Sequence, residues 1–195
     1  MMLYLHGFRS SPAAAKSQAL LAAMQTRGLA AQFACPVLSP VPDEAISQAE
    51  ALLAQALARQ ESITLIGSSL GGHYATWLAE KHNLRAILIN PAVIAKLDLG
   101  LFIGRQSNFH TGESFDFTPA HAAQLQAQIP PRLTPARYRL LLSADDEVLD
   151  YRHALAYYAG SQQSVLPGDN HSFSRFAEFI PEILACQQHL HGIPG

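Results

Sequence analysis

Residues 63–73 read ITLIGSSLGGH, a pattern that predicts a buried strand, a tight turn and a helix in succession. Residues 63–66 are apolar or β-branched, which indicates a short buried strand. They lead into GSSLG at 67–71, a match to the Gly-x-Ser-x-Gly pattern, and helix-forming residues follow from Tyr74 through Lys81. Such a strand-to-helix turn strains the backbone of its central serine and exposes the hydroxyl. The pattern therefore predicts a nucleophilic serine.

Two serines compete for the central position, and the spacing of small residues decides between them. Strand and helix pass close to each other at this turn, so the residues two positions before and after the nucleophile must be small. Ser69 has Gly67 and Gly71 at these positions, whereas Ser68 would have the bulky Ile66. We therefore expect Ser69 to be the nucleophile, with an ordinary Gly/Ser-rich turn as the alternative.

Length and composition indicate one domain with a sizeable core and little net charge. The chain has 195 residues, of which 49% are apolar and 14% are charged, against roughly 25% charged in an average domain. A domain of this size can bury roughly 70% of its unfolded surface. The net charge of −2 offers no electrostatic basis for binding nucleic acid or an anionic membrane.

The N-terminal segment and the cysteines bear on the cellular location. The first strand candidate begins at Met1, without the basic flank of a signal peptide. No segment approaches the roughly 20 apolar residues of a membrane-spanning helix. Cys35 and Cys186 show neither metal nor disulfide spacing, so reduced thiols are expected. We expect a soluble, cytoplasmic protein without a membrane span.

Strand-like and helix-like segments alternate along the chain. Strands are expected at 2–5, 31–35, 63–66, 85–90, 138–143 and 164–167. Helices are expected at 13–27, 43–59, 74–81, 120–128, 151–159 and 172–189, the last kinked or divided by Pro181. The alternation predicts a single α/β domain over residues 1–195, with a mostly parallel, doubly wound sheet of about six strands. Between 93 and 131 the alternation stops, which predicts a loop-rich insertion acting as a lid or pocket wall.

Polar loops follow the predicted strands at their carboxyl ends, where ligands bind in an open parallel sheet. A serine hydroxyl needs a base to take its proton, and that base needs an acid to hold its tautomer. His171 lies in the turn after the last strand, and acidic residues follow the strand before it. The chain order Ser, Asp, His is typical of α/β-hydrolases. The sequence therefore predicts a catalytic triad with His171 as the base.

Three aspartates compete for the role of the triad acid. Asp150 stands directly before a helix and is expected to cap its free N–H groups. Asp146 has the apolar Val148 two residues later, which we expect to dock the loop against the core and fix the carboxylate. That arrangement would leave Asp145 and Glu147 pointing away. We therefore expect Asp146 to be the acid.

The loop after the first strand is predicted to complete an oxyanion hole. A tetrahedral intermediate needs N–H donors already aimed at its oxyanion. The backbone of Leu70, directly after the nucleophile, can supply one donor, and the backbone of Phe8 the other, because Gly7 lets the chain turn inward. His6 is expected to shape this loop by hydrogen bonding, and His73 to have a supporting or structural role. The histidines show no ligand spacing, so no metal and no cofactor is expected.

The insertion supplies candidate substrate-binding residues. Its aromatic side chains, Phe109 and Phe115 among them, suit an apolar pocket that admits an acyl chain. Arg9 and Arg105 are the basic residues expected near the site, because the other candidate arginines stand at the beginnings of strands. Coenzyme A carries several phosphates and would favour more basic residues at the pocket mouth. We therefore expect Arg9 to contact substrate.

The motifs as a set resemble the YqiA-type esterases, a compact bacterial branch of the α/β-hydrolase superfamily. The matching pieces are YLHGF at 4–8, SSP at 10–12, GSSLGG at 67–72, NPA at 90–92, DEVLDYR at 146–152 and NH at 170–171. The resemblance implies a short hydrolase core without the antiparallel strands that often precede it. It also implies hydrolysis of carboxylic or thioester acyl bonds, and it points to Asp146 as the acid.

The combined expectation is a serine hydrolase that cleaves ester or thioester bonds of a small-molecule substrate through an acyl-enzyme. An acyl-CoA thioesterase is the nearest variant. A non-catalytic binding protein on the same fold is the alternative from another class, because fold alone does not establish activity. A nucleotide-binding module is disfavoured because the loop at 67–72 lacks the Lys-Ser/Thr ending of a P-loop.

Overall fold

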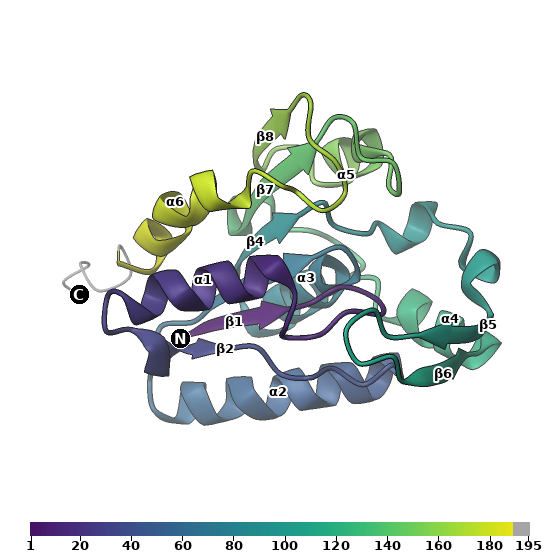
Figure 1. The fold of residues 1–195 in the computed structure, drawn as a ribbon, viewed down its shortest axis with the longest axis horizontal. Coiled ribbons are helices and arrows are strands. Elements are labelled where there is room, and N and C mark those ends of the chain that lie inside the picture. The colour runs from purple at the N-terminus through teal and green to yellow at the C-terminus, as the bar shows by residue number, and fades with distance from the viewer. Residues whose placement is uncertain (189–195) are drawn as a thin grey trace.

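Six parallel strands form the main sheet in the computed structural model, which describes residues 1–188 (Figure 1). The strand order is β2-β1-β3-β4-β7-β8. The strands are β1 (Met2–Leu5), β2 (Phe33–Ala34), β3 (Thr64–Ser68), β4 (Arg85–Ile89), β7 (Tyr138–Ser143) and β8 (Gln162–Leu166). The expected α/β fold with a parallel sheet of six strands is confirmed.

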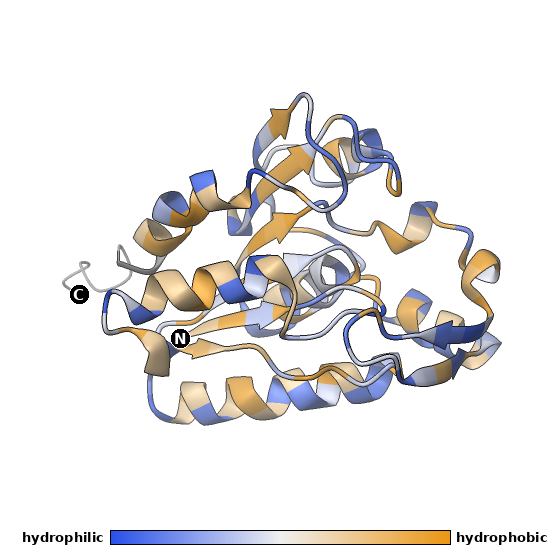
Figure 2. Cartoon of the chain, in the orientation of Figure 1, coloured by the Kyte–Doolittle hydropathy of each residue, from blue (hydrophilic) through white to orange (hydrophobic). Residues whose placement is uncertain are grey.

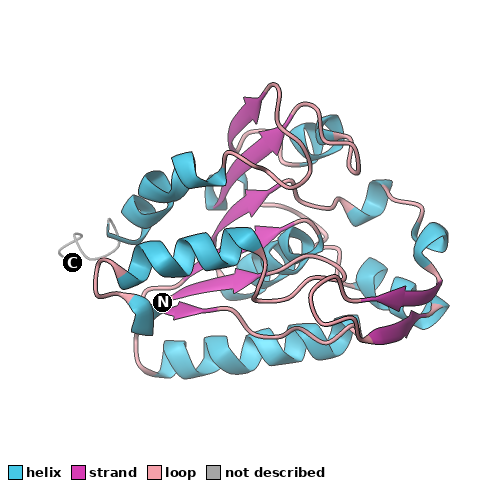
Figure 3. Ribbon diagram, in the orientation of Figure 1, coloured by secondary structure: helices cyan, strands magenta, loops and turns pink. Residues whose placement is uncertain are grey.

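Helices cover both faces of this sheet (Figure 3). One face packs against α1 (Ala15–Gln25) and α6 (Phe176–Gln188). The other packs against α2 (Pro42–Ala58), α3 (Leu70–His82), α4 (Pro119–Ala127) and α5 (Tyr151–Tyr157). Short 3₁₀ turns lie at Ala30–Gln32 and Pro135–Arg137. None of the helices within residues 1–188 is long and apolar enough to cross a membrane.

The strands are apolar on both faces, as a sheet buried between two helical layers requires (Figure 2). Successive side chains of β1 alternate between the layers: Met2 and Tyr4 pack towards α1 and α6, and Leu3 and Leu5 towards the opposite helices. All four are at most 1% exposed. Burial of this kind is the main favourable term in folding, at roughly 25 cal/mol per Å² of apolar surface.

The order of the strands positions the site. β1 lies between the two strands that follow it in the chain, with β2 on one side and β3 on the other. The carboxyl ends of β1 and β3 therefore meet at a switch point of the topology, where an open α/β sheet forms its ligand crevice. The loop after β1 and the turn after β3 lie against each other here: a Cβ added at Gly7 would stand 3.2 Å from that of Ser69.

The insertion (residues 93–131) contains more regular structure than its sequence indicated. Two 3₁₀ turns, Ile94–Lys96 and Leu99–Phe102, lead into an antiparallel hairpin of β5 (Gly104–Ser107) and β6 (Ser114–Phe117). The expected short helix follows as α4. The hairpin lies beyond the carboxyl edge of the main sheet (Figure 1). Its strands mix charged, polar and aromatic residues, so no continuous apolar run marked them in the sequence.

The expected bounds of the second strand and of the last helix need correction. The strand at 31–35 is reduced to the two residues of β2, an edge strand that pairs only with β1, and Pro36 behind it lacks an N–H donor. The last helix begins at Phe176, because residues 172–175 form a turn. The helix also runs through Pro181 without division. Its expected end at His189 lies outside the described residues.

Candidate active site

Ser69 occupies the turn between β3 and α3 in a strained conformation. Its φ of 54° and ψ of −122° place a non-glycine residue in a region that side chains rarely adopt. The turn is held from the neighbouring strand: the N–H of Ser69 donates to the Ile89 carbonyl, and the Ser69 carbonyl accepts from Ala92, each at 3.0 Å. The strain persists because the surrounding backbone imposes it.

The small residues around this turn are required by close backbone contact. A Cβ added at Gly67 would stand 2.3 Å from the carbonyl oxygen of Gly71, and one at Gly71 would stand 2.0 Å from that of Leu5. No side chain fits at either position without moving backbone. Ser68 ends β3 and is buried, whereas Ser69 lines a cavity. The geometry thus agrees with the spacing argument that selected Ser69.

The structure brings Ser69, His171 and Asp146 together in one hydrogen-bonded row. His171 Nε2 lies 3.2 Å from Ser69 Oγ, and His171 Nδ1 lies 2.8 Å from Asp146 Oδ2. A carboxylate only accepts, so the imidazole proton resides on Nδ1 and leaves Nε2 free to accept the serine proton. The Asp146 side chain is 2% exposed, which shields its hydrogen bond to His171 from water. The row is the arrangement that activates a serine hydroxyl.

The Asp146 carboxylate is fixed differently from the sequence expectation. Val148 does not dock into the core, because 57% of it is exposed. Leu149 packs against the core instead. The second carboxylate oxygen, Oδ1, accepts the backbone N–H groups of Val148 and Leu149 at 2.8 Å each. The turn of the chain therefore holds the carboxylate, and the apolar anchor lies one residue later than expected.

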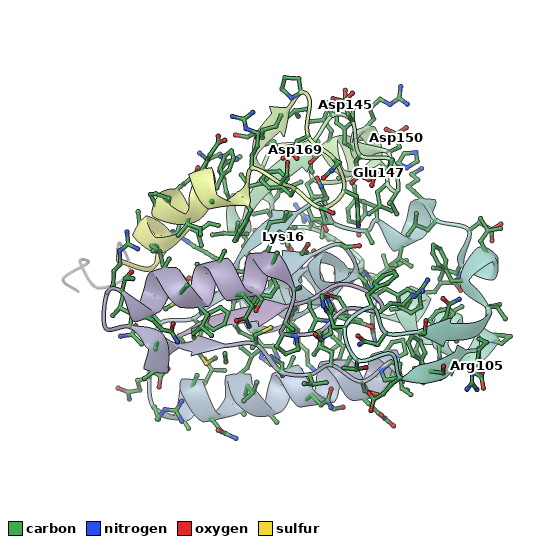
Figure 4. All side chains as sticks on the ribbon, viewed as in Figure 1. Lys16, Arg105, Asp145, Glu147, Asp150 and Asp169 are labelled. Atoms are coloured by element: carbon green, nitrogen blue, oxygen red, sulfur yellow. The ribbon has the colours of Figure 1, made fainter. Side chains whose placement is uncertain are left out.

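Asp145 and Glu147 do not point away, which corrects a second expectation. Asp145 Oδ2 accepts the N–H of Gly168 at 2.6 Å, and Glu147 Oε2 accepts the N–H of His171 at 3.0 Å. The His171 N–H holds the pKa of Glu147 below its usual value. In Figure 4 both carboxylates lie beside the loop that carries the histidine. Three consecutive acidic residues thus bind one loop.

Asp150 caps α5, as its position before that helix predicted. Its carboxylate accepts the N–H of Arg152 at 3.0 Å and also binds the Arg152 guanidinium. The guanidinium lowers the pKa of Asp150 to about 2. Its two oxygens are engaged at the start of α5, so Asp150 is not in competition with Asp146 for the imidazole.

Asn90 is a supporting residue that sequence reasoning missed. It is buried at the end of β4 with a φ of 41°. Its amide nitrogen lies 2.9 Å from Ser143 Oγ and 3.2 Å from the carbonyl oxygens of both Asn170 and His171. Its amide oxygen accepts the N–H of Ser143 at 2.8 Å. Asn90 thus joins the ends of β4 and β7 to the loop that carries His171 (residues 167–175, the histidine loop). An Asn-Pro pair closing a buried strand was the available signal.

Two further side chains hold the histidine loop (Figure 4). Asp169 is 2% exposed, and its carboxylate accepts the N–H groups of Asn170 and Ser174, each at 2.9 Å, and the Ser174 hydroxyl. Lys16 on α1 donates to the carbonyl of Ser172 at 2.8 Å. Burial lowers the pKa of this lysine, and the nearby carboxylates partly oppose the effect. The histidine loop is therefore bound by Lys16 of α1 as well as by the acidic residues 145–147.

The loop after β1 has the internal bonds needed to orient its amides. The Gly7 carbonyl accepts from His6 Nδ1 at 3.0 Å and from the Ser10 N–H at 3.2 Å. His6 Nε2 accepts the N–H of Leu38 at 3.1 Å, and burial lowers the pKa of His6, which keeps the ring neutral. His6 therefore shapes the loop, as expected. The Gly7 carbonyl and the Phe8 N–H belong to one peptide plane, so these bonds also orient that N–H.

Ser69 and His171 open into an apolar cavity of about 310 Å³. Much of its wall comes from the insertion: Ile94, Leu97, Leu99, Phe102, Phe109, Phe117 and Leu125. Arg9 also lines it, and the Arg9 guanidinium lies 4.2 Å from the centre of the Phe109 ring. Phe115 lines a neighbouring cavity of about 460 Å³, which shares Phe8, Arg9 and Leu70 with the first.

Arg105 and His73 are the two remaining residues for which the sequence predicted a position or a role. Arg105 does not approach the cavity: it lies on the outer side of the hairpin, 71% exposed and 3.8 Å from Asp116 (Figure 4). His73 is buried on α3, close to the backbone of Leu125 in α4. Burial lowers the pKa of His73 to about 4, so the ring is neutral at neutral pH. This supports the structural role expected for it.

Known proteins share both the sequence pattern and the fold. The family described as "Uncharacterised protein family (UPF0227)" matches residues 1–188. Est1E from Butyrivibrio proteoclasticus superposes with a TM-score of 0.68 at 15% identity, covering 96% of this chain and 88% of that one. A putative hydrolase from Agrobacterium vitis S4 superposes with a TM-score of 0.71 at 17% identity, covering 95% and 87%.

A third similar structure is an α/β serine hydrolase homologue from Coxiella burnetii, with a TM-score of 0.59 at 15% identity and coverage of 95% and 84%. At such identities the likeness bears on the fold. The family match covers nearly the whole chain and agrees with the motifs in the loops after β1, β3 and β7. The chain belongs to the UPF0227 (YqiA) family and has the α/β-hydrolase fold.

Proposed function

We propose that the chain is a serine hydrolase that cleaves carboxylic ester or thioester acyl bonds of small molecules. The observation that carries the proposal is the hydrogen-bonded row Ser69–His171–Asp146, with spacings of 3.2 and 2.8 Å, at the mouth of an apolar cavity. Nucleophile, base and acid come from loops after three different strands, and the strained serine turn presents the hydroxyl to the cavity.

The reaction begins when Ser69 Oγ attacks the acyl carbon while His171 Nε2 takes its proton. Asp146 stabilises the resulting imidazolium through Nδ1–H. The N–H of Leu70 at the start of α3 and the N–H of Phe8 donate to the oxyanion, each contributing about 3 kcal/mol in the transition state. His171 then gives its proton to the leaving alcohol or thiol, and the acyl group remains on Ser69.

Water completes the cycle. His171 takes a proton from a water molecule, whose oxygen attacks the acyl carbon of the Ser69 ester. The second tetrahedral intermediate collapses, the proton returns to Ser69 Oγ, and the free carboxylic acid leaves. Both halves use the same base and the same donors, which is why one arrangement of residues serves both.

The cavity favours an apolar acyl group and an uncharged leaving group. Its wall consists mainly of aliphatic and aromatic side chains. Arg9, the basic residue in the wall, already donates to the Ser107 carbonyl at 2.8 Å and stacks on Phe109. The outward position of Arg105 removes the other arginine expected to meet phosphates. These contacts favour simple acyl esters over acyl-CoA.

A fluorophosphonate probe tests the proposal, because it labels serines activated as nucleophiles. We expect one adduct, located on Ser69 by mass spectrometry, and hydrolysis of p-nitrophenyl acyl esters that the probe abolishes. A parallel panel of acyl-CoA substrates measures the thioester preference. Absence of both labelling and hydrolysis in folded protein would instead favour a non-catalytic binding protein on this fold.

A further inference from the structure

We propose that the β5–β6 hairpin positions the oxyanion loop (residues 7–10), with Asn108 as the positioning residue that joins them. The inference rests on the proposed function, because it concerns the alignment of the Phe8 N–H during acyl transfer. The hairpin would then act on the rate of the chemical step, in addition to forming a wall of the cavity. The insertion contacts each residue from 8 to 10.

The Phe8 side chain is held by three aromatic rings of the insertion. Its ring meets those of Phe102, Phe115 and Phe117 edge to face, with centroid distances of 6.0, 5.7 and 5.4 Å. Edge-to-face pairs favour one mutual orientation of the rings. The position of Phe8, and with it the direction of its N–H, therefore depends on the packing of the insertion.

The next two residues of the loop are held through their backbones. The N–H of Phe109 donates to the Arg9 carbonyl, and the Asn108 side-chain nitrogen donates to the Ser10 carbonyl, both at 2.8 Å. Arg9 returns a bond from its Nε to the Ser107 carbonyl, also at 2.8 Å. Three consecutive residues at the end of β5 thus bind the loop after β1, about a hundred positions earlier in the chain.

These bonds stabilise a conformation that the loop would otherwise avoid. Arg9 has a φ of 59°, in the left-handed region that a non-glycine residue adopts only when its surroundings impose it. The bonds to its carbonyl and to that of Ser10 lie directly beside this torsion. Loss of them would let Arg9 relax towards an ordinary conformation and move Ser10, whose N–H holds the Gly7 carbonyl and with it the peptide plane of the Phe8 N–H.

Asn108 is well placed to be the joining residue because its own conformation is fixed. Its side-chain oxygen accepts the N–H groups of His110 and Thr111 at 2.8 and 3.1 Å, and its backbone N–H donates to the Glu113 carbonyl. One end of the amide thus closes the hairpin turn, and the other end reaches the oxyanion loop. Replacement by aspartate keeps the first function and removes the second.

The arrangement also couples acyl binding to the oxyanion hole. Phe102 and Phe117 touch Phe8 on one side and line the cavity beside Ser69 on the other. An acyl chain that fills the cavity restrains the rings that hold Phe8. Binding energy from a part of the substrate remote from the reacting bond would then appear in kcat as well as in KM.

The test compares N108D and N108A with R105A, a control on the outer side of the same hairpin. Ester hydrolysis is measured together with the melting temperature and with inhibition by an alkyl trifluoromethyl ketone, whose hemiketal oxyanion would occupy the hole. We expect both Asn108 variants to lose roughly 10- to 100-fold in kcat at nearly constant KM, and to bind the ketone more weakly by a similar factor. N108D should keep its melting temperature, and R105A should match the wild type.

The outcomes distinguish this inference from the proposed function. Wild-type hydrolysis that depends on Ser69, together with unchanged kcat in N108D and N108A, would overturn the positioning role alone. A loss confined to KM, or equal losses in R105A, would overturn it as well. A folded wild-type protein without Ser69-dependent labelling or hydrolysis would overturn both.

Discussion

The carboxylate of Glu147 accepts the backbone N–H of His171 at 3.0 Å. The preceding residue, Asp146, binds the ring of the same histidine at 2.8 Å. Two adjacent acidic side chains therefore hold one histidine at two points, the ring by one and the backbone by the other. The buried carboxylate of Asp146 orients the His171 ring. The exposed carboxylate of Glu147 positions the backbone of the histidine loop.

Ser69→Ala is expected to abolish ester hydrolysis and probe labelling and to leave the fold intact. Ser69 Oγ is the hydroxyl that lies 3.2 Å from His171 Nε2, whereas Ser68 is buried in β3. Labelling with a fluorophosphonate, melting temperature and hydrolysis are measured for both alanine variants. Loss of labelling in Ser68→Ala with labelling retained in Ser69→Ala would show that the other serine is the nucleophile.

Asp146→Asn is expected to lower kcat by up to about 10⁴, because an amide at this position favours the wrong imidazole tautomer. Asp145→Asn is the matched control, since Asp145 binds the Gly168 N–H, whereas Asp146 binds the ring. The loss of kcat in this control should be far smaller. Kinetics at matched folding decide the question: a larger loss in Asp145→Asn would move the acid there.

Glu147→Ala is expected to reduce kcat by less than about tenfold, because an exposed charge-assisted bond contributes little. The lowered pKa of Glu147 means that its carboxylate accepts the His171 N–H at all pH values above about 4.5, the usual value. The wild-type and variant profiles of kcat against pH should therefore run parallel from pH 5 upward. Profiles that diverge above pH 6 would mean that Glu147 acts on the imidazole itself.

Phe109→Ala is expected to shift the preference towards bulkier or longer acyl groups. Phe109 lines the cavity that contains Ser69, and 70% of it is exposed, so its removal widens the mouth at little cost in stability. Phe115→Ala should leave the preference unchanged, because Phe115 lines the neighbouring cavity. A series of p-nitrophenyl esters measures both. An unchanged preference in Phe109→Ala would exclude this ring from the acyl site.

The stability of the wild type is expected to fall as the pH is lowered from about 6.5 to about 4. Burial lowers the pKa of His73 to about 4, so the unfolded chain binds this proton more readily than the folded one. The contribution of the neutral His73 ring to the free energy of unfolding is fully present above pH 6.5. This contribution falls by up to about 3 kcal/mol as the pH is lowered to about 4.

His73→Asn provides the comparison, because its amide is also polar but has no proton to gain as the pH is lowered. Denaturant unfolding at several pH values should give a smaller pH slope for this variant than for the wild type. Equal slopes in the two proteins would show that another group binds the proton. Measurements of the free energy of unfolding, rather than activity, keep this prediction separate from the catalytic ones.

Features that depend on neighbouring residues in the chain could be predicted from the sequence. The Gly67–Gly71 spacing selected Ser69 because the strand-to-helix turn brings these residues into contact through local geometry. Asp150 before α5 could be recognised as a cap for the same reason. The alternation of apolar and polar segments was sufficient for the parallel sheet, since each strand and helix is defined by its own periodicity.

The contacts between loops follow from the folded arrangement and could not be predicted from the sequence. Asp145 and Glu147 meet partners 23 and 24 residues later, and Asn108 meets Ser10 across 98 residues. Such bonds depend on which strand ends lie side by side and on the turn that each loop adopts. A residue's type and local spacing do not specify these partners. The same limit explains Val148: whether it or Leu149 faces the core depends on the turn that the Asp146 carboxylate closes.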